Sequence, residues 1–134
     1  MKKLLSLVAI IVFTMSVQAQ VSVIGNKAVG EAVNAAKIIS IYSLTVTKWA
    51  DGSKIIVYDN GSDANNGFYS ALGKDHLSFK KEWMKKQLTG EAKAPENMGS
   101  DAEVIAKVAS TPGAVGFVKA ASVTGSVKVL LELK

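Results

Sequence analysis

Residues 99–117 read GSDAEVIAKVASTPGAVGF and describe a helix, a turn and a strand in succession. Ser100 and Glu103 have the spacing of a capping box, in which each side chain satisfies a backbone donor at the start of a helix. Apolar residues then recur on one helical face: Ala102, Ile105, Val108 and Ala109. The Pro112-Gly113 pair ends this helix, and Ala114–Val118 continues as a short buried strand. This unit predicts an α/β fold.

Strand and helix patterns alternate along the rest of the chain. Continuous apolar runs between turn residues predict strands, and apolar residues spaced three and four apart predict helices. The expected elements are strands at Val21–Ile24, Lys54–Tyr58 and Val127–Lys134, helices at Ala28–Ile39, Phe68–Leu72 and His76–Leu88, and a linker at 89–98. This order predicts α/β architecture: one three-layer lobe with a mostly parallel mixed sheet flanked by helices.

The first nineteen residues have the pattern of a secretory signal peptide. Lys2 and Lys3 form a basic segment, residues 4–17 form an apolar core, and small residues precede a cleavage site after Ala19. The apolar run of about 14 residues is shorter than the roughly 20 needed to span a bilayer. We therefore expect a periplasmic or secreted protein without stable membrane insertion, in which residues 20–134 form a single lobe.

Composition excludes several classes of function. The sequence has no cysteine, which excludes disulfides, thiol chemistry and cysteine-based metal sites. All 16 basic residues are lysines, and the 14 that follow residue 19 stand against 11 acidic residues, a net charge of +3. Nucleic-acid readers usually depend on bidentate arginine and on stacking aromatic residues, so binding of nucleic acid is not expected.

The predicted helix at His76–Leu88 follows Asp75, a suitable N-cap. Its larger apolar residues are expected to face inward: Phe79, Trp83, Met84 and Leu88. Four lysines are expected to face outward: Lys80, Lys81, Lys85 and Lys86. Such a lysine face is usually only solvated, and binding of an anionic lipid or an acidic partner is the alternative.

The loop at Asp59–Asn66 is the best candidate for a ligand site. It follows a buried strand and leads into a helix, whose N-terminal N–H groups and dipole favour an anion. Open α/β sheets bind ligands beyond the carboxyl ends of their strands. Four residues there could let a ligand approach or could donate to it: Gly61, Ser62, Asn65 and Asn66. A polar connecting loop without a ligand is the alternative interpretation, because Asp59 and Asp63 would repel an anion.

Enzymatic chemistry is not expected. His76 is the one histidine, whereas a metal site needs three or four converging ligands. The chain has no Gly-x-Ser-x-Gly nucleophile motif, and the spacing of its eleven acids singles out no catalytic pair. We therefore predict no catalytic residue, no metal site and no cofactor, and a structural role for His76.

In order and spacing, several motifs resemble one lobe of the phosphate-type substrate-binding proteins of bacterial ABC transporters. That family typically shows a W-x-D-G motif, a Ser-Gly-Thr-Arg-like anion loop before a Phe, and a P-G-A-I-G-Y motif before the last strands. The matching segments are Trp49-Ala50-Asp51-Gly52, Ser62 with Phe68, Gly99-Ser100-Asp101-Ala102-Glu103, Thr111-Pro112-Gly113-Ala114-Val115-Gly116-Phe117 and Gly125-Ser126-Val127-Lys128-Val129-Leu130. The resemblance extends from about Val21 to Leu130.

The resemblance implies a type II periplasmic-binding-protein-like fold and a non-enzymatic, substrate-binding-protein-like lobe. The implied partners are a small anionic solute, such as phosphate or another oxyanion, and an ABC transporter or a second lobe-bearing protein. In the anion loop only Ser62 matches, because Asp63, Ala64 and Asn65 stand where the family has Gly, Thr and Arg. The alternative is therefore a secreted protein–protein interaction module that has lost its ligand. The sequence leaves the oligomeric state open.

Overall fold

The computed structural model describes residues 20–133, so the predicted signal peptide at residues 1–19 lies outside the described residues. The strands are β1 (Val21–Gly25), β2 (Ile56–Asn60), β3 (Glu96–Met98), β4 (Ala114–Lys119) and β5 (Lys128–Leu133). The α-helices are α1 (Ala35–Tyr42), α2 (Ala64–Leu72), α3 (His76–Leu88) and α4 (Asp101–Ser110), and a 3-10 turn, η1, spans Ala120–Ser122. None of these helices is long and apolar enough to cross a membrane.

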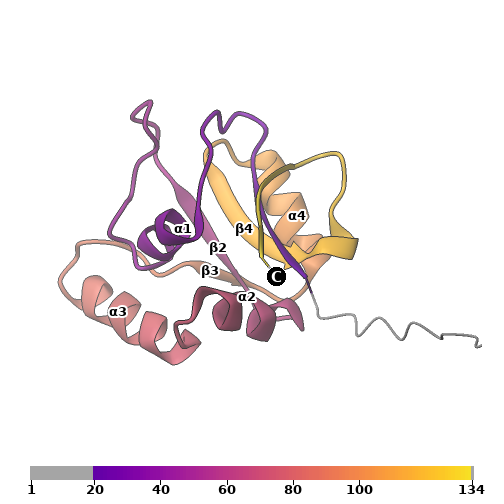
Figure 1. Ribbon diagram of the computed structural model, residues 1–134. Coiled ribbons are helices and arrows are strands. Elements are labelled where there is room, and N and C mark those ends of the chain that lie inside the picture. Colours follow the sequence, from indigo (N-terminus) through magenta and orange to yellow (C-terminus); the bar gives the residue numbers. More distant parts are fainter. Residues whose placement is uncertain (1–19, 134) are drawn as a thin grey trace, which may run out of the picture.

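The strands form one mixed sheet in the order β3-β2-β4-β1-β5 (Figure 1). β2 runs parallel to both β3 and β4, whereas β1 is antiparallel to both β4 and β5. The predicted α/β lobe is confirmed, and its sheet combines two parallel with two antiparallel pairings. Because β2, β3 and β4 are parallel, their carboxyl ends meet at one edge of the sheet.

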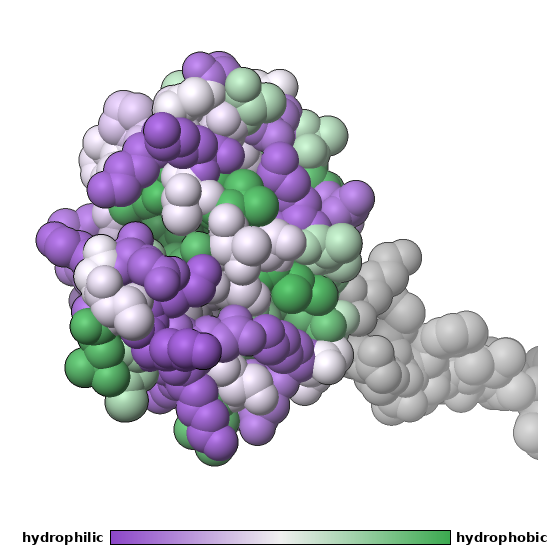
Figure 2. All heavy atoms as spheres, turned by 90° about the vertical axis from the view of Figure 1, so that its left-hand side faces the viewer, coloured by the Kyte–Doolittle hydropathy of each residue, from purple (hydrophilic) through white to green (hydrophobic). Residues whose placement is uncertain are grey.

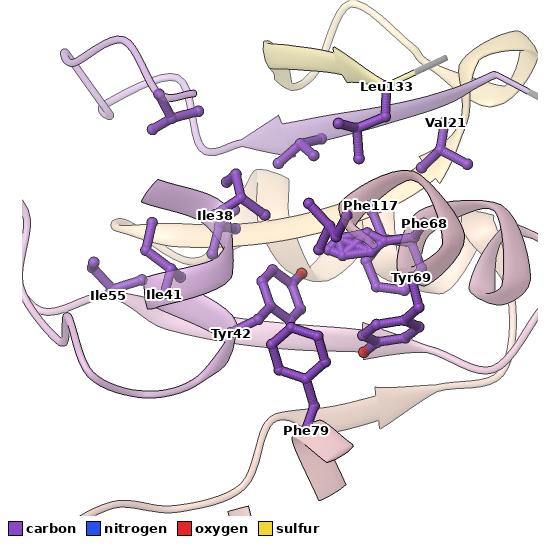
Figure 3. Close-up of a cluster of buried hydrophobic side chains, with 14 of the residues drawn as sticks. Val21, Ile38, Ile41, Tyr42, Ile55, Phe68, Tyr69, Phe79, Phe117 and Leu133 are labelled. Atoms are coloured by element: carbon purple, nitrogen blue, oxygen red, sulfur yellow. The ribbon is translucent and has the colours of Figure 1, made fainter. Parts of the chain in front are cut away.

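Each face of the sheet is covered by helices, which gives three layers (Figure 1). Alternation along β1 places Val23 in one buried cluster, with residues from α1, α2 and α3, and Ile24 in the other, with residues from α4. Aromatic rings pack together with aliphatic side chains in the first cluster (Figure 3). Phe68 of α2 stacks on Phe117 of β4 with ring centroids 3.8 Å apart, and Tyr42 of α1 packs against both.

The first helix begins later than the predicted Ala28–Ile39. Asn34 caps α1 because its side chain accepts a hydrogen bond from the backbone N–H of Lys37. Upstream, the Asn26 side chain accepts from the N–H of Ala28 and donates to the carbonyl oxygen of Val108, which holds this segment outside any helix. Val29 and Val33 are nevertheless buried, so their spacing reflects a packed loop rather than the start of a helix.

Two strands also differ from prediction. β2 runs from Ile56 to Asn60 instead of ending at Tyr58, so Asp59 and Asn60 are strand residues and not part of the loop. The predicted linker at 89–98 ends in β3, a three-residue edge strand parallel to β2. A strand this short carries no periodic signal in the sequence.

Burial corrects two predicted helix faces. In α4 the buried residues are Val104, Ile105 and Val108, whereas Ala102 is exposed. In α3, Phe79 and Trp83 are buried as predicted, but Met84 and Leu88 point into solvent. The reason is the position of each residue around the helix axis. Phe79 and Trp83 define the inward face, and Leu88 lies on the opposite side of the helix from them.

Gly116 allows α4 to approach the sheet closely, and we expect Gly116→Ala to lower the free energy of unfolding by about 1–3 kcal/mol. A Cβ atom there would lie 2.6 Å from Cγ1 of Val104 and 3.2 Å from Cγ2 of Val108. Urea denaturation measures the change. Gly30→Ala is the matched control, because a Cβ at Gly30 meets no atom within 4 Å. Equal stability of the two variants would contradict the close approach.

Candidate functional site

The end of β2 presents two polar side chains to opposite faces of the sheet. Successive strand residues point to opposite sides, so Asp59 faces α2 and α3 while Asn60 faces α4. Both residues are almost completely buried. Buried polar groups require partners, and each of the two organises its own hydrogen-bond network.

On the α4 side, Asp101 collects hydrogen bonds from three segments. Its Oδ1 accepts from Nδ2 of Asn60 and from Oγ of Ser62, each at 2.8 Å. Its Oδ2 accepts from Oγ of Ser122 at 2.7 Å and from the backbone N–H of Lys119 at 3.2 Å. This single carboxylate therefore joins the end of β2, the end of β4 and η1 at the first turn of α4.

The charge of Asp101 is stabilised by these donors. Partial burial acts to raise the pKa of its carboxyl, but the hydrogen bonds from Ser122, Asn60, Ser62 and the Lys119 N–H together outweigh burial. The pKa of Asp101 is therefore lowered from its ordinary value of 3.8. An ionised carboxylate in the first helical turn is also favoured by the helix dipole.

On the other face, Asp59 joins α2 to α3. Tyr69 donates its hydroxyl to Oδ1 of Asp59 at 2.7 Å, and Nε2 of His76 lies 2.9 Å from Oδ2. The His76 ring stacks on Tyr69 with centroids 4.3 Å apart. Burial and the nearby Asp59 carboxylate raise the pKa of Tyr69 well above its ordinary value, so its phenol stays protonated and remains a donor.

A hollow of about 620 Å³ opens at this edge of the sheet. Its lining comes from the loop after β2, from α2 and α3, and from β3 with the segment before it. Three donor residues around it are exposed, Asn66, Lys80 and Asn97, while His76 is mostly buried against Asp59. Within residues 20–133, no protein group hydrogen-bonds with the side chains of Asn66, Lys80 or Asn97.

The four predicted site residues all lie on this hollow. Two of them already donate hydrogen bonds within the protein. The Ser62 hydroxyl donates to Asp101, and the Asn65 amide donates to the carbonyl oxygen of Asn60 at 2.8 Å. Gly61 donates its N–H to the carbonyl oxygen of Met98, and a Cβ at Gly61 would come within 3.3 Å of the Asn97 side chain. The Asn66 side chain is exposed at the rim.

Sequence reasoning missed the contribution of the neighbouring elements. The sequence predicts a solvated face for Lys80 and a linker for Asn97, yet both residues line the hollow beside Asn66. Asn97 pairs with Asp59 across the β2–β3 register. Since β3 has no periodic signal, no local pattern could have placed Asn97 beside the candidate loop.

The arrangement offers hydrogen-bond donors and shows no assembled relay for nucleophilic catalysis. The hydroxyl of Ser62 is bonded to Asp101 and His76 is bonded to Asp59, and within residues 20–133 no serine or threonine hydroxyl hydrogen-bonds with His76. The same residues contain no cluster of three or more His, Asp or Glu side chains that could hold a metal ion.

A second hollow, of about 460 Å³, lies at the opposite edge of the sheet, near the start of β2 and β4. Trp49 and Gly113 line it, and Nε1 of Trp49 donates to the carbonyl oxygen of Gly113 at 3.0 Å. Both acids that line it are already engaged: Glu31 accepts from the Ala50 N–H and from Lys37, and Asp51 accepts from the N–H and hydroxyl of Ser53. It is remote from the candidate loop.

The fold is that of one lobe of phosphate-type substrate-binding proteins, as the motif order suggested. The chain is similar to an ABC-type phosphate transport receptor from Vibrio cholerae, with a TM-score of 0.65 and 21% identity over 84% of this chain and 46% of that one. A Clostridium perfringens protein crystallised with bound phosphate has a TM-score of 0.65 and 16% identity, over 84% and 45% of the two chains. PstS from Borrelia burgdorferi has a TM-score of 0.61 and 17% identity, over 84% and 47%.

The chain thus spans less than half the length of these three proteins. No protein-family model matches the sequence, and no curated protein matches it. At these identities the similarity shows the fold alone.

Proposed function

We propose that the protein is a non-enzymatic solute-binding lobe that holds a small oxyanion, such as phosphate, in the hollow at the end of β2. The observation that carries the proposal is the group of donors around that hollow, Asn66, Lys80 and Asn97, whose side chains have no hydrogen-bond partner among residues 20–133, on a lobe with the fold of phosphate receptors. Ligands of open α/β sheets bind at this carboxyl edge.

Lys80 supplies the charge for such a ligand, and the two amides supply neutral donors. Lys80 comes from α3, Asn66 from the first turn of α2 and Asn97 from β3, so the donors approach from three sides. Gly61 has no Cβ, which lets the Asn97 side chain lie close to the backbone after β2. Two acids oppose tight binding, because their negative charges repel an anion. Asp63 is fully exposed at the rim of the hollow, and Asp59 lines the hollow below the rim. We therefore expect affinity in the millimolar range.

The proposed setting is the periplasm or the exterior of a bacterial cell. It is supported by the signal-peptide pattern at residues 1–19, with cleavage after Ala19, and by the transport receptors that share the fold. In this proposal residues 20–134 form a single lobe that passes its solute to an ABC transporter or shares it with a second lobe-bearing protein.

Isothermal titration with phosphate and sulfate tests the site, and we expect Lys80→Gln to weaken oxyanion binding about 3- to 10-fold. A charge-assisted hydrogen bond contributes about 1.5–3 kcal/mol when buried, and the exposure of Lys80 reduces this value. The protein should be purified after export, with its N-terminus read by mass spectrometry. Lys81→Gln is the matched control, because Lys81 is exposed on the same helix but does not line the hollow.

The absence of heat at millimolar phosphate, sulfate and related oxyanions would remove solute binding from the proposal. Equal loss of binding in Lys80→Gln and Lys81→Gln would mean that the oxyanion responds only to the net charge of the protein. The hollow would then not be the binding site.

The second candidate function is a secreted interaction module that kept the lobe and lost its ligand. The observation that favours it is the internal use of the Ser62 hydroxyl and the Asn65 amide, the polar groups that the loop would otherwise offer to an anion. Light scattering and cross-linking test this candidate. A strictly monomeric protein, with no partner recovered by affinity capture, would count against it.

A further inference from the structure

The outward face of α3 carries a stripe of large apolar side chains. Leu77, Met84 and Leu88 are 56%, 64% and 82% exposed, although such residues are usually buried. At 3.6 residues per turn, Met84 and Leu88 lie about 20° to either side of Leu77 around the helix axis. The three side chains therefore form one line, about 16 Å long, on the side of α3 opposite Phe79 and Trp83.

Lysines flank this stripe on both sides. By the same geometry Lys80 lies on one flank, and Lys81 and Lys85 lie on the other. All three are exposed, and within residues 20–133 none of them pairs with a carboxylate. Figure 2 shows the side of the molecule on which α3 lies, with hydrophobic surface in green among hydrophilic surface in purple along its lower part.

The remaining charges of α3 are turned away from the stripe. Glu82 is bonded to Lys74 at 2.8 Å, and Lys86 donates to the carbonyl oxygen of Leu44 at 2.8 Å. The helix itself is held firmly, because Phe79 and Trp83 are buried and the Trp83 indole donates to the carbonyl oxygen of Tyr42. The stripe and its lysines are therefore a fixed surface rather than a frayed helix.

From this surface we infer that α3 docks on an anionic phospholipid bilayer. An apolar stripe bordered by lysines is the pattern of a helix that lies in the membrane interface, with its apolar side chains among the acyl chains and its lysines at the headgroups. A second copy of the chain fits less well, because two such faces would bring six lysines together. The inference does not rest on the proposed solute binding.

Vesicle co-sedimentation provides the first test. We expect the protein to bind vesicles of phosphatidylglycerol and phosphatidylcholine, and to bind vesicles of phosphatidylcholine alone much more weakly. The double variant Met84→Gln, Leu88→Gln should lower the partition coefficient about tenfold or more. Lys81→Gln and Lys85→Gln should each lower it about fivefold. Lys80 is left unchanged, so that the oxyanion hollow stays intact.

Two variants elsewhere on the molecule serve as matched controls. Val129→Gln changes a 40% exposed residue of β5, and Lys107→Gln changes an exposed lysine of α4 on the other face of the sheet. Both should bind anionic vesicles as the unaltered protein does. All proteins carry the same N-terminus, so any contribution from residues 1–19 is common to them.

A label provides a direct second test, because the chain has no cysteine. An environment-sensitive fluorophore on Leu88→Cys should shift to the blue on anionic vesicles, and the same fluorophore on Lys107→Cys should not. Three results would overturn the inference: no binding to anionic vesicles, equal binding by the Met84 and Leu88 double variant, or equal binding to phosphatidylcholine alone. Binding of an acidic protein without any binding of vesicles would assign the stripe to that partner instead.

Discussion

Phe117→Ala is expected to lower the free energy of unfolding by about 3–5 kcal/mol, the usual cost of removing a fully buried phenylalanine. The Phe117 side chain is completely buried, and its ring lies parallel to that of Phe68 within 2°. It also packs against Tyr42 and Tyr69, so the variant would open a cavity at the meeting point of α1, α2 and β4 (Figure 3). Urea denaturation followed by tryptophan fluorescence measures the change.

Two variants control this prediction. Phe117→Leu keeps most of the volume and should lose much less stability than the alanine variant. Lys107→Ala shortens an exposed side chain of α4 and should change stability by no more than about 0.5 kcal/mol. A loss below about 1 kcal/mol in Phe117→Ala would mean that the aromatic cluster is not the centre of the core.

Elements with a strong local signal were predictable from the sequence. The hydroxyl of the capping residue Ser100 accepts a hydrogen bond from the N–H of Glu103, and the Glu103 carboxylate accepts one from the N–H of Gly99. Helix α4 therefore begins where the spacing indicated. Asp75 caps α3 by accepting from the N–H of Leu77, and Gly73 ends α2 in the left-handed conformation. Each of these signals depends on residues within four positions of one another.

Elements fixed by distant contacts were not predictable. The segment before α1 has helical spacing at Val29 and Val33, but the Asn26 side chain bonds to a carbonyl group 82 residues away and keeps it in a loop. Met84 and Leu88 look like core residues by type, yet the inward face of α3 is set by Phe79 and Trp83. In the first case tertiary packing overrode the local pattern. In the second case helix geometry overrode residue type, because Leu88 lies on the opposite side of the helix from Phe79.

The candidate site shows the same division. The sequence predicted a loop at Asp59–Asn66, of which only residues 61–63 lie between β2 and α2, and all four residues named there lie on the hollow. What could not be foreseen was the partner of Ser62, because Asp101 lies 39 residues further along the chain. The parallel pairing of β2 with β3 likewise brings Asn97 to the loop, and pairing of this kind leaves no trace in a three-residue segment.

Asp101→Ala is the second substitution for which we expect a large loss, about 3 kcal/mol in the free energy of unfolding. The variant removes an acceptor from four donors, two on each carboxylate oxygen. The largest part of the loss would come from Asn60. This residue is completely buried, and its side-chain amide would keep only the carbonyl oxygen of Phe117 as an acceptor. Single hydrogen bonds to a charged group contribute about 1.5–3 kcal/mol, and water entering beside the half-buried Asp101 limits the total.

The pH dependence of stability tests the charge of Asp101 separately from its shape. Because its pKa is lowered in the folded protein, its contribution is fully present above its ordinary pKa of 3.8 and is lost as the pH falls through the lower, folded value. Asp101→Asn keeps the shape and cannot ionise, so the stability gap between it and the unaltered protein should narrow below about pH 4. Glu91→Gln, an exposed control, should stay within about 0.5 kcal/mol at every pH. A gap that stays constant from pH 7 to pH 3 would show that Asp101 joins β2, α4 and η1 through shape alone, without its charge.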